Sequence, residues 1–201
     1  SQLPAVTDNS VLELAIRNNR IAQFEVASAY QQRAFQNQYP DTVWWERDLG
    51  SRDYLEALYW LRKSATAGHL PAINQVGVHY LEGWGIQKDF DQAAIWLQKA
   101  VEQGFVPAMV TLARVQLKRM KIRSRQRYID TYYRSAFQLL TQAAESGDAA
   151  GQFWLGNLYN LSNQNSEKKI QAFHWWSLAA AQGFKPAITK LNSGTEDSLS
   201  P

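Results

Sequence analysis

The chain has 201 residues, which is enough for one large domain or two small ones with a buried core. It contains no cysteine and only three histidines, so disulfide frameworks and thiol chemistry are excluded and a dedicated metal site is disfavoured. A hydrophobic fraction of 45% with eight Trp, nine Tyr and eight Phe predicts a globular protein, and no apolar run approaches the ~20 residues that span a bilayer.

The net charge of +3 is unevenly distributed along the chain. Between Arg114 and Arg134, eight basic residues accompany a single acidic residue, Asp130. The remaining 13 basic and 17 acidic residues carry a net charge of −4. The basic character of the protein is therefore one local patch.

Two features bear on the location of the protein. The chain begins with Ser1 rather than Met, as a processed or trimmed chain would. The absence of cysteine suits an exported bacterial protein, which avoids accidental oxidation in this way. We therefore expect a periplasmic or otherwise exported location, with the cytoplasm as the alternative.

Residues 1–9 are predicted to form a tail, and a helical array is predicted to begin near Ser10. Asn18 stands where an early helix must end in a left-handed conformation, which Asn tolerates better than most residues. The residues that follow at helical spacing and match a clearer unit further along are Ala22, Val26, Ala27 and Tyr30.

Residues 31–52 interrupt this pattern and are predicted to form a long excursion between helices. Large aromatic residues in such a segment either anchor a partner or fold back over the exposed end of the first repeat, and the sequence favours neither role. The two tryptophans of this excursion, Trp44 and Trp45, are secondary candidates for partner binding.

The clearest repeat covers residues 57–72 and returns 36 residues later in residues 93–108. Apolar residues at helical spacing predict two helices per unit. Each unit has a glycine where one helix must end, because glycine accepts a left-handed conformation, and most have a proline at the start of the next helix. The glycines at these predicted elbows are Gly68, Gly104, Gly147 and Gly183.

Residues 119–131 form a second insertion, because the step from Gly104 to Gly147 is 43 residues instead of 36. The favoured interpretation of its basic run is a solvated segment, and the alternative is a contact with an acidic protein or with membrane head groups. Nucleic acid is disfavoured because few aromatic residues are interleaved with the basic ones. The basic residues kept as secondary candidates for partner binding are Arg123, Arg125 and Arg127.

The repeat frame continues to Leu191 and leaves residues 192–201 as a C-terminal tail. Its fullest form, in residues 71–100, contains Gly83-Trp84-Gly85 and an Asp, Asp89, before the second helix. This pattern resembles Sel1-like repeats, which are relatives of tetratricopeptide repeats, over roughly residues 10–191. The resemblance implies an all-α, right-handed superhelical solenoid of antiparallel helix pairs that acts as a non-catalytic adaptor for other proteins. Asp89 is expected to cap its helix.

In such arrays the first helix of each pair lines the concave face, so the resemblance also implies a groove. The alternative is that the same positions are merely solvent-facing helix surface. Trp154 and Val78 favour a groove, because exposed aromatic and apolar residues mark interaction sites more often than charges do. The residues predicted to bind a partner are Gln75, Val78, Thr111, Arg114, Trp154 and Asn157. Trp84 is a secondary candidate, either as a surface anchor or as a cover over a repeat junction.

No set of residues in the sequence indicates catalysis. The loop around Trp84 lacks the Lys and Ser/Thr of a phosphate loop, and His69 and His79 have no third ligand or evident acid. We therefore expect no enzyme activity, no cofactor and no metal. The expected function is that of an exported bacterial envelope scaffold that binds another protein in its groove. The alternative is an immunity protein that neutralises a toxic effector, which would bind at nanomolar rather than micromolar affinity.

Overall fold

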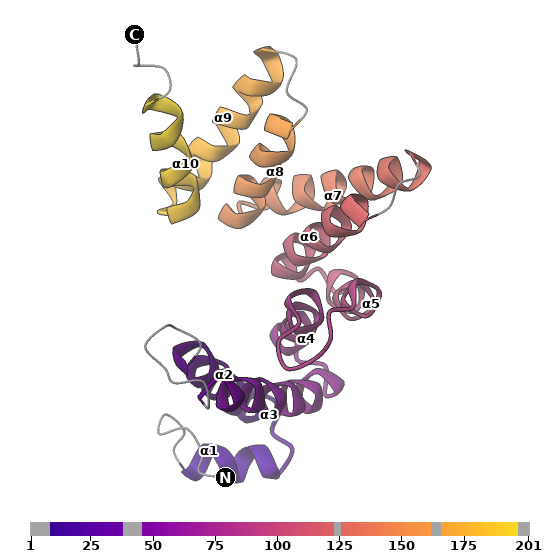
Figure 1. The fold of residues 1–201 in the computed structure, drawn as a ribbon, viewed down its shortest axis with the longest axis vertical. Coiled ribbons are helices and arrows are strands. Elements are labelled where there is room, and N and C mark those ends of the chain that lie inside the picture. The colour runs from indigo at the N-terminus through magenta and orange to yellow at the C-terminus, as the bar shows by residue number, and fades with distance from the viewer. Residues whose placement is uncertain (1–8, 38–45, 123–125, 162–165, 197–201) are drawn as a thin grey trace. The chain divides into compact units, whose positions relative to one another are not determined.

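The computed structural model describes residues 9–37, 46–122, 126–161 and 166–196. Within these ranges the chain forms ten α-helices and no β-strand, which confirms the predicted all-α fold of paired helices (Figure 1). The chain divides into two compact units, Ser1–Gln103 and Gly104–Pro201. Among the described helices, none is both long and apolar enough to cross a membrane.

The first unit consists of five helices, and each packs against the next in sequence. Its fully buried apolar side chains include Leu61 on the third helix, Val76 on the fourth and Leu97 on the fifth. The helices are α1 (Asn9–Ile16), α2 (Arg20–Asn37), α3 (Glu46–Thr66), α4 (Leu70–Glu82) and α5 (Phe90–Val101).

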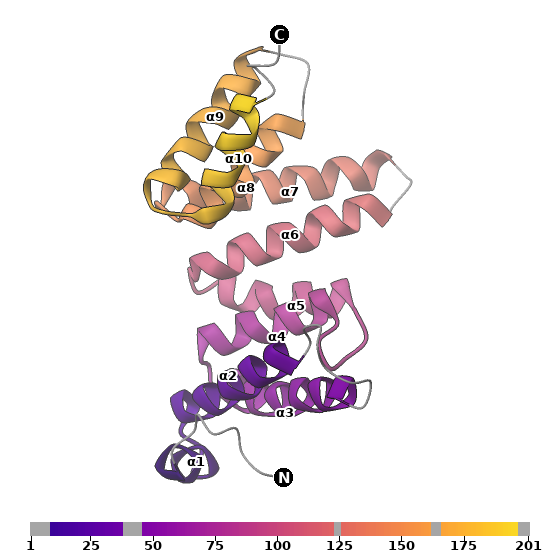
Figure 2. The ribbon, with the colours of Figure 1, turned by 60° about the vertical axis from the view of Figure 1, so that its left-hand side comes forward.

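The second unit also consists of five helices, and its first two form a long antiparallel hairpin (Figure 2). The core of this unit includes Val115, Leu140 and Leu158, each fully buried. The helices are α6 (Val106–Ile122), α7 (Gln126–Glu145), α8 (Ala149–Leu161), α9 (Ser166–Ala181) and α10 (Lys185–Glu196).

The elbows between helices lie where the sequence predicts them. At the Gly68 elbow, the Gly68 N–H donates to the Ala65 carbonyl at 2.9 Å and the His69 N–H to the Ser64 carbonyl at 3.1 Å. These bonds satisfy carbonyl groups that the end of a helix leaves without partners. The left-handed elbow residues have φ values of 64° at Asn18, 79° at Gly68, 74° at Gly104, 88° at Gly147 and 78° at Gly183.

Helix starts follow the predicted chemistry as well. The Asp89 carboxylate accepts hydrogen bonds from the N–H groups of Asp91 and Gln92, both at 2.9 Å, and so caps α5 as expected. Pro71 lies in the first turn of α4, where its missing N–H leaves no donor without a partner. The array therefore combines left-handed helix ends with capped or proline-bearing helix starts.

Most of the first insertion lengthens helices, where the sequence predicts an excursion between helices. α2 continues to Asn37 and α3 already begins at Glu46, so most of residues 31–52 is helical. Ala34 extends the buried stripe of α2, and the Arg33 guanidinium forms a two-pronged ion pair with the buried Asp53 carboxylate on α3. These contacts stabilise the longer helices and offset the conformational entropy that the added helical residues lose.

Candidate functional site

A cleft of about 350 Å³ lies on the first unit between three helices and one loop. α2, α3 and α4 each contribute side chains, and the loop that follows α4 closes one side with an indole ring. The cleft contains two residues of the predicted groove and one secondary candidate. The residues that line it are Gln31, Gln32, Phe35, Tyr54, Gln75, Val78 and Trp84.

Gln75 and Val78 of α4 line the cleft, because another face of this helix packs in the core. Ala72, Val76 and Tyr80 follow one another at four-residue intervals and are all buried. Gln75 and Val78 lie three residues apart beside this stripe, and both are only half-buried. The structure thus brings the two predicted residues to one surface.

His79 lies behind the cleft and is completely buried. Its Nδ1 is 2.8 Å from the Trp84 carbonyl oxygen, which can only accept, so Nδ1 carries the proton. The other ring nitrogen, Nε2, then accepts a hydrogen bond of 2.8 Å from the Gln31 side-chain amide. His79 therefore connects a lining residue of α2 to the loop after α4.

Burial lowers the pKa of His79 to about 4, although the hydrogen bond to the Trp84 carbonyl raises it in part. The ring is consequently neutral near pH 7, with both nitrogens occupied by protein groups. Such a ring cannot act as a general base towards a substrate, because neither nitrogen faces an open site. The role of His79 is to position Gln31 and Trp84.

Trp84 lies flat against Tyr54, with ring centres 5.4 Å apart and an angle of 15° between the planes. Gly85 allows this close approach: a Cβ atom there would lie 2.8 Å from the backbone of Tyr54 and Leu55, and its φ is 65°. Trp84 thus covers the packing between α3 and the α4–α5 loop while it also lines the cleft. Both predicted roles of Trp84 are compatible with this position.

The second unit brings together two more predicted residues. The guanidinium carbon of Arg114 on α6 is 5.8 Å from the ring centre of Trp154 on α8. Both side chains are half-buried, as is Asn157, which lies almost one turn after Trp154 on α8. An aromatic ring beside a cation is an arrangement common at interaction hot spots.

Thr111 does not belong to this surface, and the prediction for this residue is wrong. Its side chain is buried, with 6% exposure, and its hydroxyl donates to the Pro107 carbonyl at 3.0 Å. α6 packs against both α7 and α8, so more of its circumference is covered than the repeat alignment implies. Thr111 is a core residue that satisfies its hydroxyl within its own helix.

The remaining secondary candidates cannot be compared with the structure. Trp44, Trp45, Arg123 and Arg125 lie outside the described residues. Arg127 belongs to the first turn of α7, but its side chain is outside the described part.

Four cleft residues were missed by the sequence analysis, namely Gln31, Gln32, Phe35 and Tyr54. Three of them come from residues 31–37, where the sequence predicts the beginning of an excursion between helices. The spacing of Tyr30 and Ala34 could have revealed that α2 continues, because both residues are buried and lie four positions apart. No sequence signal predicts that Phe35 remains 55% exposed.

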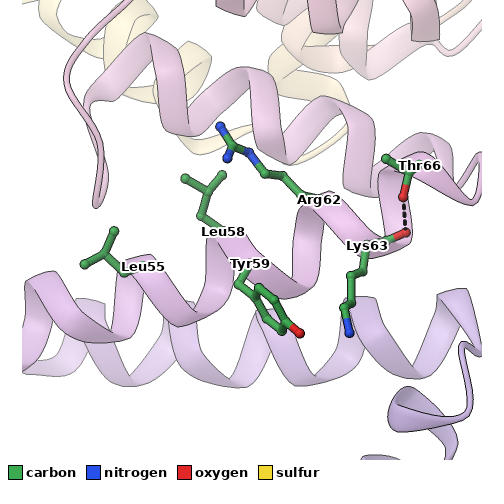
Figure 3. A pocket seen from close by; sticks show the side chains of 6 residues that line it. All are labelled: Leu55, Leu58, Tyr59, Arg62, Lys63 and Thr66. Carbon is green, nitrogen blue, oxygen red and sulfur yellow. Dashed lines mark hydrogen bonds between the residues drawn. The ribbon is translucent and has the colours of Figure 1, made fainter.

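A second hollow of about 390 Å³ lies along α3 (Figure 3). Two of its apolar side chains, Leu55 and Tyr59, are 55% and 51% exposed. The Lys63 ammonium is 4.8 Å from the Tyr59 ring centre, and the Arg62 guanidinium donates to the Tyr80 hydroxyl at 2.5 Å. Both cations are therefore engaged with neighbouring aromatic residues. In the described ranges, no three His, Asp or Glu side chains gather as a metal site would require.

Two solved structures share the fold of this chain. A Sel1 repeat protein from Oxalobacter formigenes superposes with a TM-score of 0.65 at 22% identity, over 88% of this chain and 62% of that one. A protective antigen present in uropathogenic Escherichia coli strains, which displays an SLR fold, gives a TM-score of 0.51 at 20% identity, over 88% of this chain and 41% of that one. This chain thus spans less than two thirds of either protein.

A comparison with curated proteins gave no match. A family model of the Sel1 repeat, however, matches residues 47–69, 70–105, 132–148 and 149–184, which make up more than half of the chain. The matches include the elbows at Gly68, Gly104, Gly147 and Gly183 and the capped start of α5. The chain therefore belongs to the Sel1 repeat family.

Proposed function

We propose that this protein is a non-catalytic scaffold that binds a segment of another protein in the cleft of its first unit. Sel1 repeat proteins generally mediate protein–protein interactions. The observation that carries the proposal is the cleft itself, where predicted groove residues meet the exposed Phe35 ring and the indole of Trp84. Exposed aromatic side chains beside a concave surface favour binding of another protein.

The chemistry of the cleft supports binding rather than catalysis. Its described lining residues are three amide side chains, three aromatic rings and one valine, none of which is a ready general acid, base or nucleophile at neutral pH. His79 behind the lining uses both ring nitrogens for protein contacts. A partner would be held by complementary shape and hydrogen bonds.

The Arg114–Trp154 surface of the second unit is proposed as another contact with the partner. A third is the C-terminal end of α6, where Lys118 and Lys121 are exposed and Ile122 is 62% exposed. These cations would suit an acidic surface on the partner, and the contact would weaken as salt concentration rises.

We also propose that the protein acts in the bacterial envelope after export. The complete lack of cysteine in 201 residues supports this location, because an exported protein without thiols cannot form accidental disulfides. Fractionation of cells that make the natural protein, followed by immunodetection, tests the proposal. Recovery with cytoplasmic markers would contradict it.

The interaction is tested by affinity capture from the native organism with the wild-type chain and with Val78→Asp, which introduces a charge into the cleft. Ile95→Asp is the matched control, because Ile95 is an exposed residue of α5 that does not line the cleft. We expect a partner that the wild type and the control retain and that Val78→Asp loses. Equal capture by all three folded proteins would contradict the proposed site.

The affinity for the captured partner separates the scaffold from the alternative immunity function. A scaffold can act at micromolar dissociation constants, whereas a protein that neutralises a toxic effector needs nanomolar or tighter binding. Isothermal titration calorimetry with the purified partner measures the difference directly.

A further inference from the structure

We propose that the cleft of the first unit recognises an uncharged, extended peptide segment, with an apolar side chain in the hollow and the adjoining peptide groups bonded to glutamine amides. The inference rests on the proposed function and adds the chemistry of the segment that is bound. Three observations support it: the polarity of the lining, the nature of its polar groups and the fixed positions of its walls.

The first observation is the absence of charge among the described residues of the lining. The seven described residues that line the cleft all have side chains that are neutral at pH 7. The nearby Arg33 and Asp53 are already paired with each other. A charged side chain that entered the cleft would lose water without gaining an opposite charge from these seven residues, so this part of the lining disfavours acidic and basic residues.

The second observation is that the polar groups of the seven described lining residues are amides, one phenol and one indole N–H. Gln31, Gln32 and Gln75 each offer a carbonyl acceptor and an NH₂ donor, the same pair of functions that a peptide group offers. Gln31 has a defined orientation, because its amide nitrogen donates to His79 Nε2. Such groups can bond to the backbone of a bound segment whatever its side chains are.

The third observation is that two aromatic walls, Trp84 and Tyr54, are held in place before anything binds. Trp84 is stacked on Tyr54, and its backbone carbonyl accepts a hydrogen bond from His79. Phe35 and Val78 complete the walls from α2 and α4. Binding therefore costs little ordering of Trp84 and Tyr54, and the volume of about 350 Å³ admits a short stretch of chain rather than a domain.

Selection from a random peptide library displayed on phage, of about twelve residues per peptide, tests the inference on the full chain without the native partner. Val78→Asp serves for counter-selection, and Ile95→Asp is the control. We expect the peptides that depend on Val78 to share an apolar residue with uncharged neighbours. Enrichment of acidic or basic peptides, or of none that depend on Val78, would overturn the proposal.

A synthetic copy of the best peptide then separates the two kinds of contact. Replacing its central apolar residue by Asp should weaken binding at least about tenfold, and N-methylation of the adjoining peptide bonds should weaken it by a similar factor. Gln32→Ala with Gln75→Ala should lower affinity for the parent peptide and make it insensitive to N-methylation. Insensitivity of the wild type to N-methylation would refute the role of the glutamines.

The outcome also distinguishes this inference from the broader proposal. If the native partner depends on Val78 but the selected peptides are charged, the scaffold function stands and the inferred chemistry fails. If a neutral oligosaccharide such as maltohexaose competes with the partner while no peptide is selected, the cleft recognises a carbohydrate and the inference is wrong. If neither partner nor peptide depends on Val78, both proposals fail.

Discussion

The Arg114 guanidinium on α6 faces the Trp154 ring on α8, with 5.8 Å between the guanidinium carbon and the ring centre. The repeat alignment predicts that both residues lie on one surface, but it does not predict that they contact each other. The contact gives Arg114 a role within the protein in addition to any role towards a partner.

A double-mutant cycle measures this contact. Arg114→Ala and Trp154→Ala should each lower the free energy of unfolding, and their effects should be coupled by about 0.5–1 kcal/mol, as expected for a cation beside a partly exposed ring. Urea denaturation of the four proteins supplies the values. Lys118→Ala, an exposed position on the same helix, is the control and should stay within about 0.5 kcal/mol of the wild type. Purely additive single effects would show that the two side chains do not interact.

Trp154 should also be a hot spot for the captured partner. Trp154→Ala is expected to weaken binding by at least ~2 kcal/mol while the protein stays folded, because a large ring at the centre of an interface excludes much water. Arg114→Ala should mainly slow association and reduce its dependence on salt. Calorimetry and stopped-flow kinetics test the two expectations, and unchanged affinity of a folded Trp154 variant would exclude this surface from the interface.

The low pKa of His79 makes stability depend on pH. Burial lowers this pKa from 6.5 to about 4, so between these values the unfolded chain binds a proton that the folded protein does not. Acid therefore favours unfolding: the contribution is complete above pH 6.5 and is lost as pH falls towards 4. We expect a loss on the order of 1–2 kcal/mol between pH 6.5 and pH 5 in urea denaturation.

Substitution of single histidines identifies the imidazole ring that causes this pH dependence. His79→Gln should remove most of the slope, and His174→Gln, at an exposed position of α9, is the control substitution. His69 adds a smaller effect of the same sign, because burial and the nearby Arg20 lower its pKa. A slope that persists in the His79 variant would mean that another group unfolds the protein in acid.

Much of the fold could be predicted because the repeat places its local signals at fixed distances. Gly68 and Gly104 end helices 36 residues apart, Asn18 substitutes for glycine at the first elbow, and Asp89 caps α5. Each of these signals acts over a few residues, so the local sequence is enough to predict where a helix begins or ends. The insertion at residues 31–52 has no counterpart in the repeat, and the Arg33–Asp53 ion pair that joins α2 to α3 there is a tertiary contact that local signals do not predict.

The candidate site could be predicted only in part for the same reason. Gln75 and Val78 lie beside a buried stripe of their own helix, which the periodicity reveals. Phe35 and Tyr54 lie in the same cleft because α2 and α3 pack beside α4. Thr111 is buried because α7 and α8 pack against α6. Periodicity assigns a residue to a face of its helix, but the neighbouring helices decide whether that face is buried.

The elbow at Gly104 allows backbone strain to be separated from steric crowding. Its φ is 74°, yet a Cβ atom there would meet no other atom within 4 Å, so a substitution acts through the backbone alone. Gly104→Val should cost on the order of 1–3 kcal/mol, because a β-branched residue is strained in the left-handed region. Gly104→Asn should cost clearly less, since Asn18 occupies the equivalent elbow with a φ of 64°. Thermal and urea unfolding measure both variants, and equal losses would show that conformational preference does not control this elbow.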